Sequence, residues 1–130
     1  MSNIDLIHIG IFENQFEEIR GAFDICNKFY FGGRLKYEYF ASSDAIAIED
    51  LIRFKLILID LDLSPKGSLD GYALAKKIND TYPTLPKAII TGSSSVKEKL
   101  EENQIAGIQV LQKPFDFEEL NSFLKKLGIK

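Results

Sequence analysis

Three polar residues of types that can transfer a phosphoryl group stand beside short apolar runs. Asp60 ends the run LILID, Thr91 ends the run AIIT, and Lys113 comes two residues after the run IQVL. A carboxylate can act as a nucleophile and form an acyl phosphate. An ammonium and a hydroxyl group can then stabilise the negative charge on the phosphoryl oxygens. Each residue taken alone is ordinary at a strand end, but their joint placement indicates a phosphoryl-accepting site.

The elements that must position these residues are strands alternating with helices. The apolar runs predict strands at residues 4–12, 35–40, 56–60, 88–91 and 108–111. Right-handed crossovers between such strands produce a parallel sheet that is covered on both faces. We therefore predict a single α/β domain over residues 1–130, with a flavodoxin-like, doubly wound sheet of order 2-1-3-4-5. Such sheets bind ligands at the carboxyl ends of their strands.

Five helical segments are predicted from apolar spacing and capping residues. The first carries Phe16, Ile19, Phe23 and Cys26, and Asn14 is a candidate for its N-terminal cap. The second is short, capped by Ser43 and Asp44, with Ile48, Leu51 and Ile52 facing inward. The third begins near Gly71 and buries Leu74, Ala75, Ile78 and Tyr82. The last two open with the capping pairs Ser95 with Glu98 and Asp116 with Glu119, and Gly128 ends the final helix.

Composition narrows the classes of function. The 130 residues carry a formal net charge of −3 and show no basic stripe, so nucleic acid is not expected as a direct partner. Cys26 is the single cysteine, which excludes an internal disulfide. The apolar runs are too short to span a membrane, and the first residues lack the pattern of a signal peptide. We expect a cytoplasmic protein without a membrane partner.

Four segments together resemble the receiver domain of response regulators, of the chemotaxis (CheY-like) type, over nearly the whole chain. They are LILID at 56–60, Asp70-Gly71, IITG at 89–92 and LQKPF at 111–115. The resemblance implies a response regulator in two-component phosphorelay signal transduction. In this reading Asp60 is the phospho-acceptor, Thr91 the phosphoryl-sensing hydroxyl and Lys113 the lysine that contacts the phosphoryl group.

The resemblance also implies partners and limits the enzymatic activity. A histidine kinase or a phosphotransfer protein would supply the phosphoryl group. Output would pass to a downstream protein through the face made by the helix at Ser95, the strand 108–111 and the last helix. Apart from phospho-acceptance and slow autodephosphorylation, no enzymatic activity is expected.

The sequence departs from the family where a metal normally binds. Receivers carry two adjacent acidic residues after the first strand, and the alignment puts Ile11 and Phe12 at those positions. Apolar side chains cannot bind Mg²⁺, which takes oxygen ligands. Glu13 is the nearest carboxylate, so Glu13 and Asp60 are the candidate metal ligands of a degenerate Mg²⁺ site, and Asp62 is a weaker one.

Two further departures lie beside the acceptor. The loop between Asp60 and Gly71 is three residues longer than the usual receiver spacing, and Val110 stands where receivers carry an aromatic residue.

Three hypotheses for the function follow from these observations. The chain is an active receiver, a phosphorylation-independent pseudo-receiver that binds proteins, or an unrelated enzyme on the same fold, such as a flavin-binding protein. The residues after the first strand do not supply the Ser/Thr/Gly-rich loop that a flavin phosphate would need.

Overall fold

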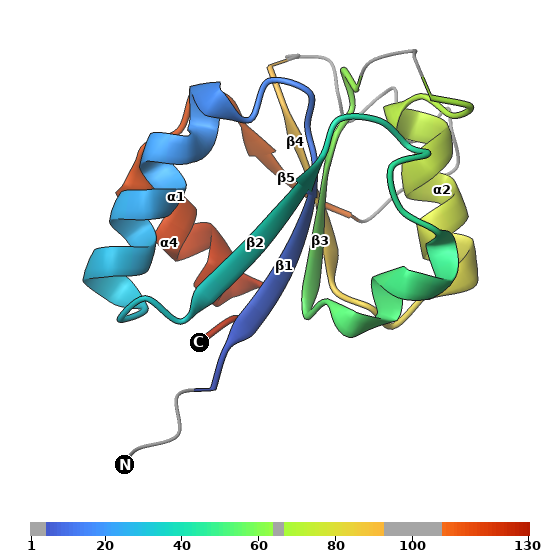
Figure 1. Ribbon diagram of the computed structural model, residues 1–130. Helices are drawn as coiled ribbons and strands as arrows, with labels where there is room; N and C mark the ends of the chain where they lie inside the picture. The colour runs from blue at the N-terminus through green and yellow to red at the C-terminus, as the bar shows by residue number, and fades with distance from the viewer. Residues whose placement is uncertain (1–4, 64–66, 93–107) are drawn as a thin grey trace.

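A five-stranded, all-parallel sheet forms the centre of the molecule (Figure 1). The computed structural model describes residues 5–63, 67–92 and 108–130. The strands are β1 (Ile7–Phe12), β2 (Leu35–Phe40), β3 (Leu56–Asp60), β4 (Lys87–Thr91) and β5 (Gln109–Gln112). Their order in the sheet is β2-β1-β3-β4-β5, which confirms the predicted doubly wound topology.

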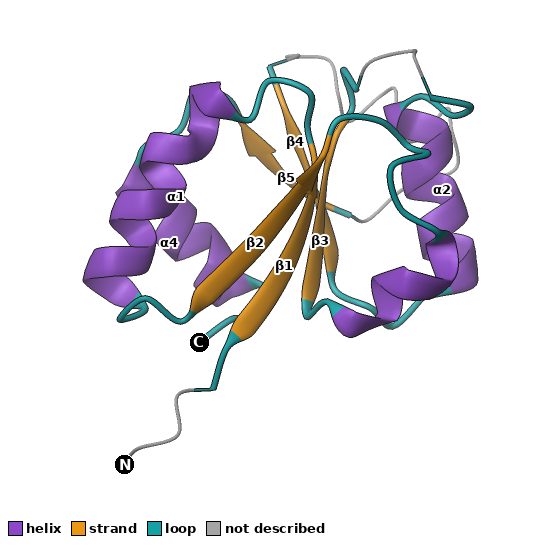
Figure 2. Ribbon diagram, in the orientation of Figure 1, coloured by secondary structure: helices purple, strands orange, loops and turns teal. Residues whose placement is uncertain are grey.

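Helices cover both faces of this sheet (Figure 2). One face carries α1 (Glu17–Tyr30) and α4 (Phe117–Lys126), and the other carries α2 (Gly71–Thr81) and a 3₁₀ helix, η1 (Ile48–Arg53). Among the described residues, no helix is long and apolar enough to cross a bilayer.

Two core layers result, because successive side chains of a strand point to opposite faces. The first core layer, against α1 and α4, includes Ile9, Ile11, Phe23, Leu58 and Leu124. The second core layer, against α2 and η1, includes Phe12, Ile57, Ile59, Leu74 and Ile78. All five residues of β3 and all five of β4 are buried, as expected for central parallel strands. Asp60 and Thr91 therefore end strands that are fixed from both sides.

The predicted cap of the second helix is wrong. Ser43 and Asp44 lie outside η1, whose N-cap is Ala47. The Ser43 hydroxyl instead accepts a hydrogen bond from the Leu69 N–H (3.0 Å), and the Asp44 carboxylate accepts from the Ser68 N–H (2.7 Å). These side chains therefore bind the loop that follows β3. Local sequence does not reveal this role, because the loop is more than 20 residues away along the chain.

The inner face of that helix was also predicted incorrectly in part. Leu51 is fully buried, but Ile52 is 69% exposed. A 3₁₀ helix has three residues per turn, so Ile48 and Leu51 share a face while Ile52 points away from it.

The ends of the last helix agree with the prediction, while several strands begin at other residues than predicted. Asp116 and Glu119 form the predicted capping box, and Gly128 adopts the positive φ of 85° that a C-terminal cap requires. Strand β1 begins at Ile7, while β4 begins one residue earlier and β5 one residue later than predicted. The helix predicted from Ser95 lies outside the described residues.

Gly71 fixes the start of α2 against the end of β3. A Cβ atom at Gly71 would lie 2.4 Å from the carbonyl oxygen of Asp60 and 2.6 Å from Cα of Leu61. Both are backbone atoms, so the contact cannot be relieved by a change of rotamer. The close approach brings the helix N-terminus to the strand end that carries Asp60.

We predict that Gly71→Ala lowers the free energy of unfolding by about 2–3 kcal/mol, the cost of overpacking a rigid contact. Gly21→Ala is the matched control, because a Cβ there meets nothing within 4 Å. It should stabilise the protein by about 0.5–1 kcal/mol, since alanine is favoured over glycine inside a helix. Urea unfolding of both variants measures the difference, and equal effects would contradict the steric argument.

Candidate functional site

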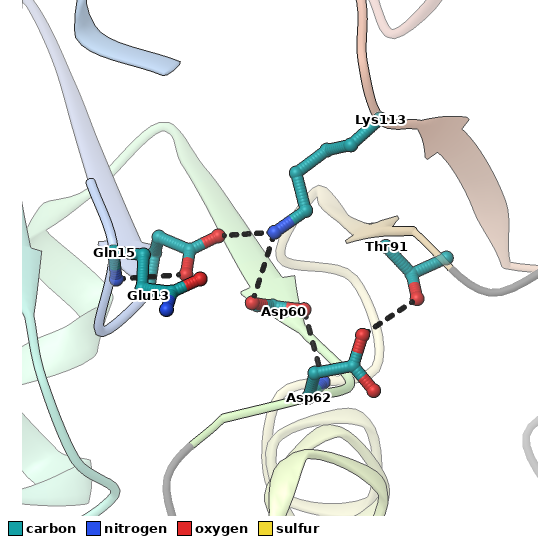
Figure 3. A network of polar contacts seen from close by, with 6 residues as sticks. All are labelled: Glu13, Gln15, Asp60, Asp62, Thr91 and Lys113. Atoms are coloured by element: carbon teal, nitrogen blue, oxygen red, sulfur yellow. Dashed lines mark hydrogen bonds and ion pairs between the residues drawn. The ribbon is translucent and has the colours of Figure 1, made fainter. Parts of the chain in front are cut away.

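Asp60 lies at the carboxyl end of β3 and is the central residue of a buried polar network (Figure 3). Its side chain is 2% exposed. One carboxylate oxygen, Oδ1, accepts a hydrogen bond from the Asp62 N–H at 2.9 Å. The turn after β3 therefore holds the carboxylate in one orientation.

Lys113 reaches Asp60 from the segment that follows β5. Its Nζ donates to Oδ2 of Asp60 at 3.2 Å and to Oε2 of Glu13 at 2.8 Å. The backbone N–H of Lys113 donates to the Thr91 carbonyl at 2.7 Å, and the Lys113-Pro114 peptide bond is cis. One ammonium thus joins the ends of β1, β3 and β5.

Glu13 is the first residue after β1, and it is brought into the site. It is 1% exposed. Its second oxygen, Oε1, accepts a hydrogen bond from the Gln15 N–H at 3.0 Å. The predicted cap Asn14 does not start α1, because Phe16 occupies the N-cap position and makes no side-chain cap bond.

The residues aligned with the missing acid pair belong to the core. Ile11 packs in the first core layer and Phe12 in the second. Both lie within β1, Ile11 two residues and Phe12 one residue before Glu13. Glu13 is therefore the residue at the carboxyl end of β1 that faces Lys113.

Thr91 completes the set of predicted residues at this edge of the sheet. It is fully buried at the end of β4, and its hydroxyl donates to Oδ2 of Asp62 at 3.5 Å. Val110 on β5 packs against the second core layer. Asp60, Thr91, Lys113, Glu13 and Asp62 thus come together from four segments of the chain.

Two buried carboxylates share one ammonium, and this shifts their pKa values in opposite directions. Burial, with hydrogen bonding to Glu13 and repulsion from its charge, raises the pKa of Asp60 to about 7. Burial also opposes ionisation of Glu13, but hydrogen bonds from Asp60, Lys113 and the Gln15 N–H outweigh it and lower the pKa of Glu13. The site therefore holds Glu13 ionised and leaves Asp60 near its midpoint at neutral pH.

The pKa of Lys113 is raised even though its ammonium is partly buried. Burial alone would lower the pKa of its ammonium, but hydrogen bonds and attraction from Glu13 and Asp60 raise it. Lys113 is therefore charged throughout the neutral range.

The donor set of the site fits Mg²⁺ poorly. Glu13 and Asp60 offer the oxygen ligands that Mg²⁺ prefers. However, Nζ of Lys113 lies within hydrogen-bonding distance of both carboxylates and occupies the position between them. No group of three or more metal-binding side chains occurs among the described residues. The predicted Mg²⁺ ligands are thus brought together, but as the partners of an ammonium.

A cavity of about 550 Å³ opens over Asp60. Its described lining consists of Asn14, Gln15, Glu18, Ile19, Asp60, Asp62, Gly92, Lys113 and Pro114. Sequence analysis did not identify Glu18 as part of the site. The helical spacing of Phe16 and Ile19 does indicate that residue 18 lies in the first turn of a helix. It does not indicate that this turn lies next to Asp60, because helix periodicity carries no information about which other segment packs there.

No protein-family model matches the chain. Among curated proteins, it is 34% identical over 73 residues to the transcriptional regulatory protein ZraR of Escherichia coli (strain K12), a match that covers 56% of this chain and 16% of ZraR. It is 28% identical over 85 residues to the transcriptional regulatory protein TctD of Salmonella typhimurium (strain LT2), covering 65% of this chain and 38% of TctD. The matches therefore span well under half of these relatives.

Solved structures of receiver domains share the fold. The receiver domain of NtrX from Brucella abortus superposes with a TM-score of 0.69 at 22% identity, covering 92% of this chain and 96% of that one. A CheY-like response regulator receiver domain protein from Methanospirillum hungatei JF-1 gives 0.69 at 23% identity, with coverage of 95% and 94%. The comparisons confirm the predicted resemblance to response-regulator receiver domains, and the solved structures show that the fold is shared.

We predict that Asp60→Asn stabilises the folded protein and that the gain grows with pH. Because burial raises the folded pKa of Asp60 from 3.8 to about 7, the wild-type protein loses stability as the pH rises between these values. Asparagine can still accept the Asp62 N–H but carries no charge. The gain in the free energy of unfolding should be about 1–3 kcal/mol larger at pH 8 than near pH 4.5.

Urea unfolding at the two pH values tests this expectation. Glu118→Gln is the control, because Glu118 is an exposed carboxylate on α4. A pH-independent effect of Asp60→Asn, or an equal effect of both variants, would contradict the assignment of Asp60 as a destabilised buried carboxylate.

Proposed function

We propose that Asp60 accepts a phosphoryl group from a histidine kinase or a phosphotransfer protein, and that Lys113 and Thr91 contact the phosphoryl group. One observation carries this proposal. The Asp60 carboxylate is buried at the base of a cavity large enough for a phosphoryl group, with the Lys113 ammonium 3.2 Å from its Oδ2. A carboxylate and a cation in this arrangement have the parts that acyl phosphate formation needs.

The proposed reaction is a displacement at phosphorus. An oxygen of the Asp60 carboxylate forms a bond to phosphorus as the bond from phosphorus to the donor histidine nitrogen breaks, and the histidine leaves with the electron pair of that bond. Both oxygens accept a hydrogen bond, Oδ1 from the Asp62 N–H and Oδ2 from Lys113, and we propose Oδ2 as the nucleophile because it lies on the side of the Lys113 ammonium. The Lys113 ammonium stabilises negative charge on the phosphoryl oxygens, which is the main requirement of this chemistry.

The phosphorylated state would rearrange the network. A phosphoryl group adds a charge of about −1.5 to −2 at pH 7 and competes with Glu13 for Lys113. The Thr91 hydroxyl, which donates to Asp62 next to Asp60, offers a further donor. Output to a downstream protein is proposed through β5, α4 and the segment of Ser95, the last of which lies outside the described residues.

A second candidate function is a phosphorylation-independent protein-interaction module. The closed network of Glu13, Lys113 and Asp60 favours it, because both contacts of Nζ are made to carboxylates of the chain itself. In this case the three residues form a structural ion pair network, and partner binding does not depend on Asp60.

We predict that incubation with phosphoramidate adds one phosphoryl mass to the wild-type chain and none to Asp60→Asn. Asp62→Asn, which keeps the backbone N–H that binds Asp60, should still be modified. Intact-mass spectrometry, with and without Mg²⁺, measures the product. An unmodified wild-type chain under all these conditions, with partner binding unchanged in Asp60→Asn, would favour the second candidate.

The rate of phosphorylation should rise with pH. Only the ionised carboxylate is nucleophilic, and with the pKa of Asp60 near 7 its ionised fraction increases roughly tenfold from pH 6 to pH 8. Glu13→Gln removes a negative neighbour, so its rate profile should lie at lower pH than the wild-type profile. Because both proteins meet the same donor, ionisation of phosphoramidate cancels in the comparison, and superimposable profiles would contradict the coupling of Glu13 to Asp60.

A further inference from the structure

Apolar side chains are exposed on the outer surface of α1, towards its C-terminal end. Phe29 is 67% exposed, and Ile25 and Tyr30 are exposed as well. The half-buried ring of Phe117 on α4 continues this surface, because its centroid lies 6.0 Å from that of Phe29 and 6.3 Å from that of Tyr30. We call these four residues the α1 patch. Grouped apolar side chains on a surface are typical of a site that another protein covers.

Small residues precede Ile25 on this surface of α1, and larger residues follow it. Gly21 and Ala22 come four and three residues before Ile25, and Lys28 and Phe29 come three and four residues after it. Helix positions with these spacings lie on one side of the helix. A Cβ atom at Gly21 would meet nothing within 4 Å, although glycine is unfavourable inside a helix. The space above Gly21 is therefore open to a side chain of another molecule.

This surface of α1 is complementary to itself in shape. If two α1 helices run antiparallel about a two-fold axis at Ile25, the small residues of each copy lie opposite the larger residues of the other. Lys28 and Phe29 of one copy then pack over Gly21 and Ala22 of the second copy, and the two Ile25 side chains meet at the axis. A two-fold interface requires such a surface, because the same residues serve both copies.

The charges along α1 favour the same antiparallel arrangement. The first turn of α1 is acidic, with Glu17 and Glu18, and its last turn is basic, with Lys28. In an antiparallel pair, Lys28 of one copy lies near the first-turn carboxylates of the other, whereas a parallel pair would bring like charges together. The partial charges at the helix ends are also paired with opposite signs in the antiparallel arrangement.

We propose that the outer surface of α1 is an interface between two copies of this chain, which pair antiparallel about Ile25. A second copy is the occupant because the surface is complementary to itself both in shape and in charge. A single pair of helices buries a small area, so the dimer is weak and reversible. Glu18, in the first turn of α1, lines the cavity over Asp60, so the two cavities lie at opposite ends of the helix pair. The inference does not depend on phosphorylation of Asp60.

Sedimentation equilibrium of the full chain tests the proposal. The wild-type protein should show a reversible monomer–dimer equilibrium between about 10 and 500 µM. Ile25→Lys puts two ammonium groups opposite each other at the axis, so the dissociation constant should rise at least about tenfold. Ile52→Lys is the matched control, because it is the same substitution at an exposed isoleucine of η1, on the other face of the sheet (Figure 1). Its dissociation constant should stay within about twofold of wild type.

An exchange of side-chain size tests the register of the pair. Gly21→Leu fills the space that the second copy needs, so it should weaken the dimer about tenfold, although leucine favours the helix of the monomer. The double variant Gly21→Leu with Phe29→Ala returns space opposite the new side chain, and its dissociation constant should lie within about threefold of wild type. A stronger dimer in Gly21→Leu would contradict the axis at Ile25.

An exchange of charge tests the direction of the pair. Lys28→Glu and Glu18→Lys should each raise the dissociation constant about fivefold at low salt, because each brings like charges together across the interface. The double variant restores opposite charges and should return to within about twofold of wild type. These differences should shrink at about 0.5 M NaCl, where exposed charges are screened. Failure of the double variant to recover would overturn the antiparallel arrangement.

Two results would overturn the inference as a whole. One is a wild-type chain that stays monomeric up to about 500 µM, because the occupant of the α1 patch is then not a second copy. The other is an equal effect, or no effect, of Ile25→Lys and Ile52→Lys on a wild-type dimer, because the interface then lies elsewhere. Both isoleucines are exposed, so neither lysine should change the circular dichroism of the monomer.

Discussion

The ion pairs of Lys113 with Glu13 and Asp60 are the interaction on which the site depends. One ammonium joins the carboxyl ends of β1, β3 and β5, which are remote in sequence but adjacent at one edge of the sheet. Buried carboxylates are costly unless they are paired and hydrogen bonded. Here each carboxylate has a backbone N–H on one oxygen and Lys113 on the other. These contacts outweigh the cost of burial for Glu13, whose pKa is lowered, but offset it only in part for Asp60, whose pKa is raised.

The same arrangement links stability to reactivity. Two carboxylates with one cation cannot both be ionised freely, so the proton is held by Asp60, whose pKa rises to about 7, while Glu13 stays ionised. A carboxyl group that is half-protonated at neutral pH is a weaker nucleophile than a fully ionised one, so the raised pKa of Asp60 would slow any reaction in which its carboxylate attacks.

The geometry of the sheet provides the rigidity that this network requires. Asp60 and Thr91 end two strands that are buried on both faces, and Gly71 allows α2 to begin against the Asp60 carbonyl with no space for a side chain. The longer loop after β3 is held to the segment before η1 by Ser43 and Asp44. Within the same loop, the Asp62 carboxylate lies next to Thr91, whose hydroxyl donates to it.

Sequence alone determined the fold, because the alternation of apolar runs with helices that carry capping residues, such as Asp116 and Gly128 at the two ends of the last helix, is a local property of the chain. It also predicted which polar residues meet, since parallel strands bring Asp60, Thr91 and Lys113 to one edge.

Only the tertiary structure decided that Glu13, and not its neighbours Ile11 and Phe12, faces Lys113. The physical reason is that a shift of one residue along a strand reverses the direction of every side chain. The end of β1 is set by its pairing with β2 and β3, in which Ile11 and Phe12 are fixed opposite Leu58 and Ile59. The loop role of Ser43 and the position of Glu18 at the cavity likewise depend on contacts between distant segments, which no local pattern records.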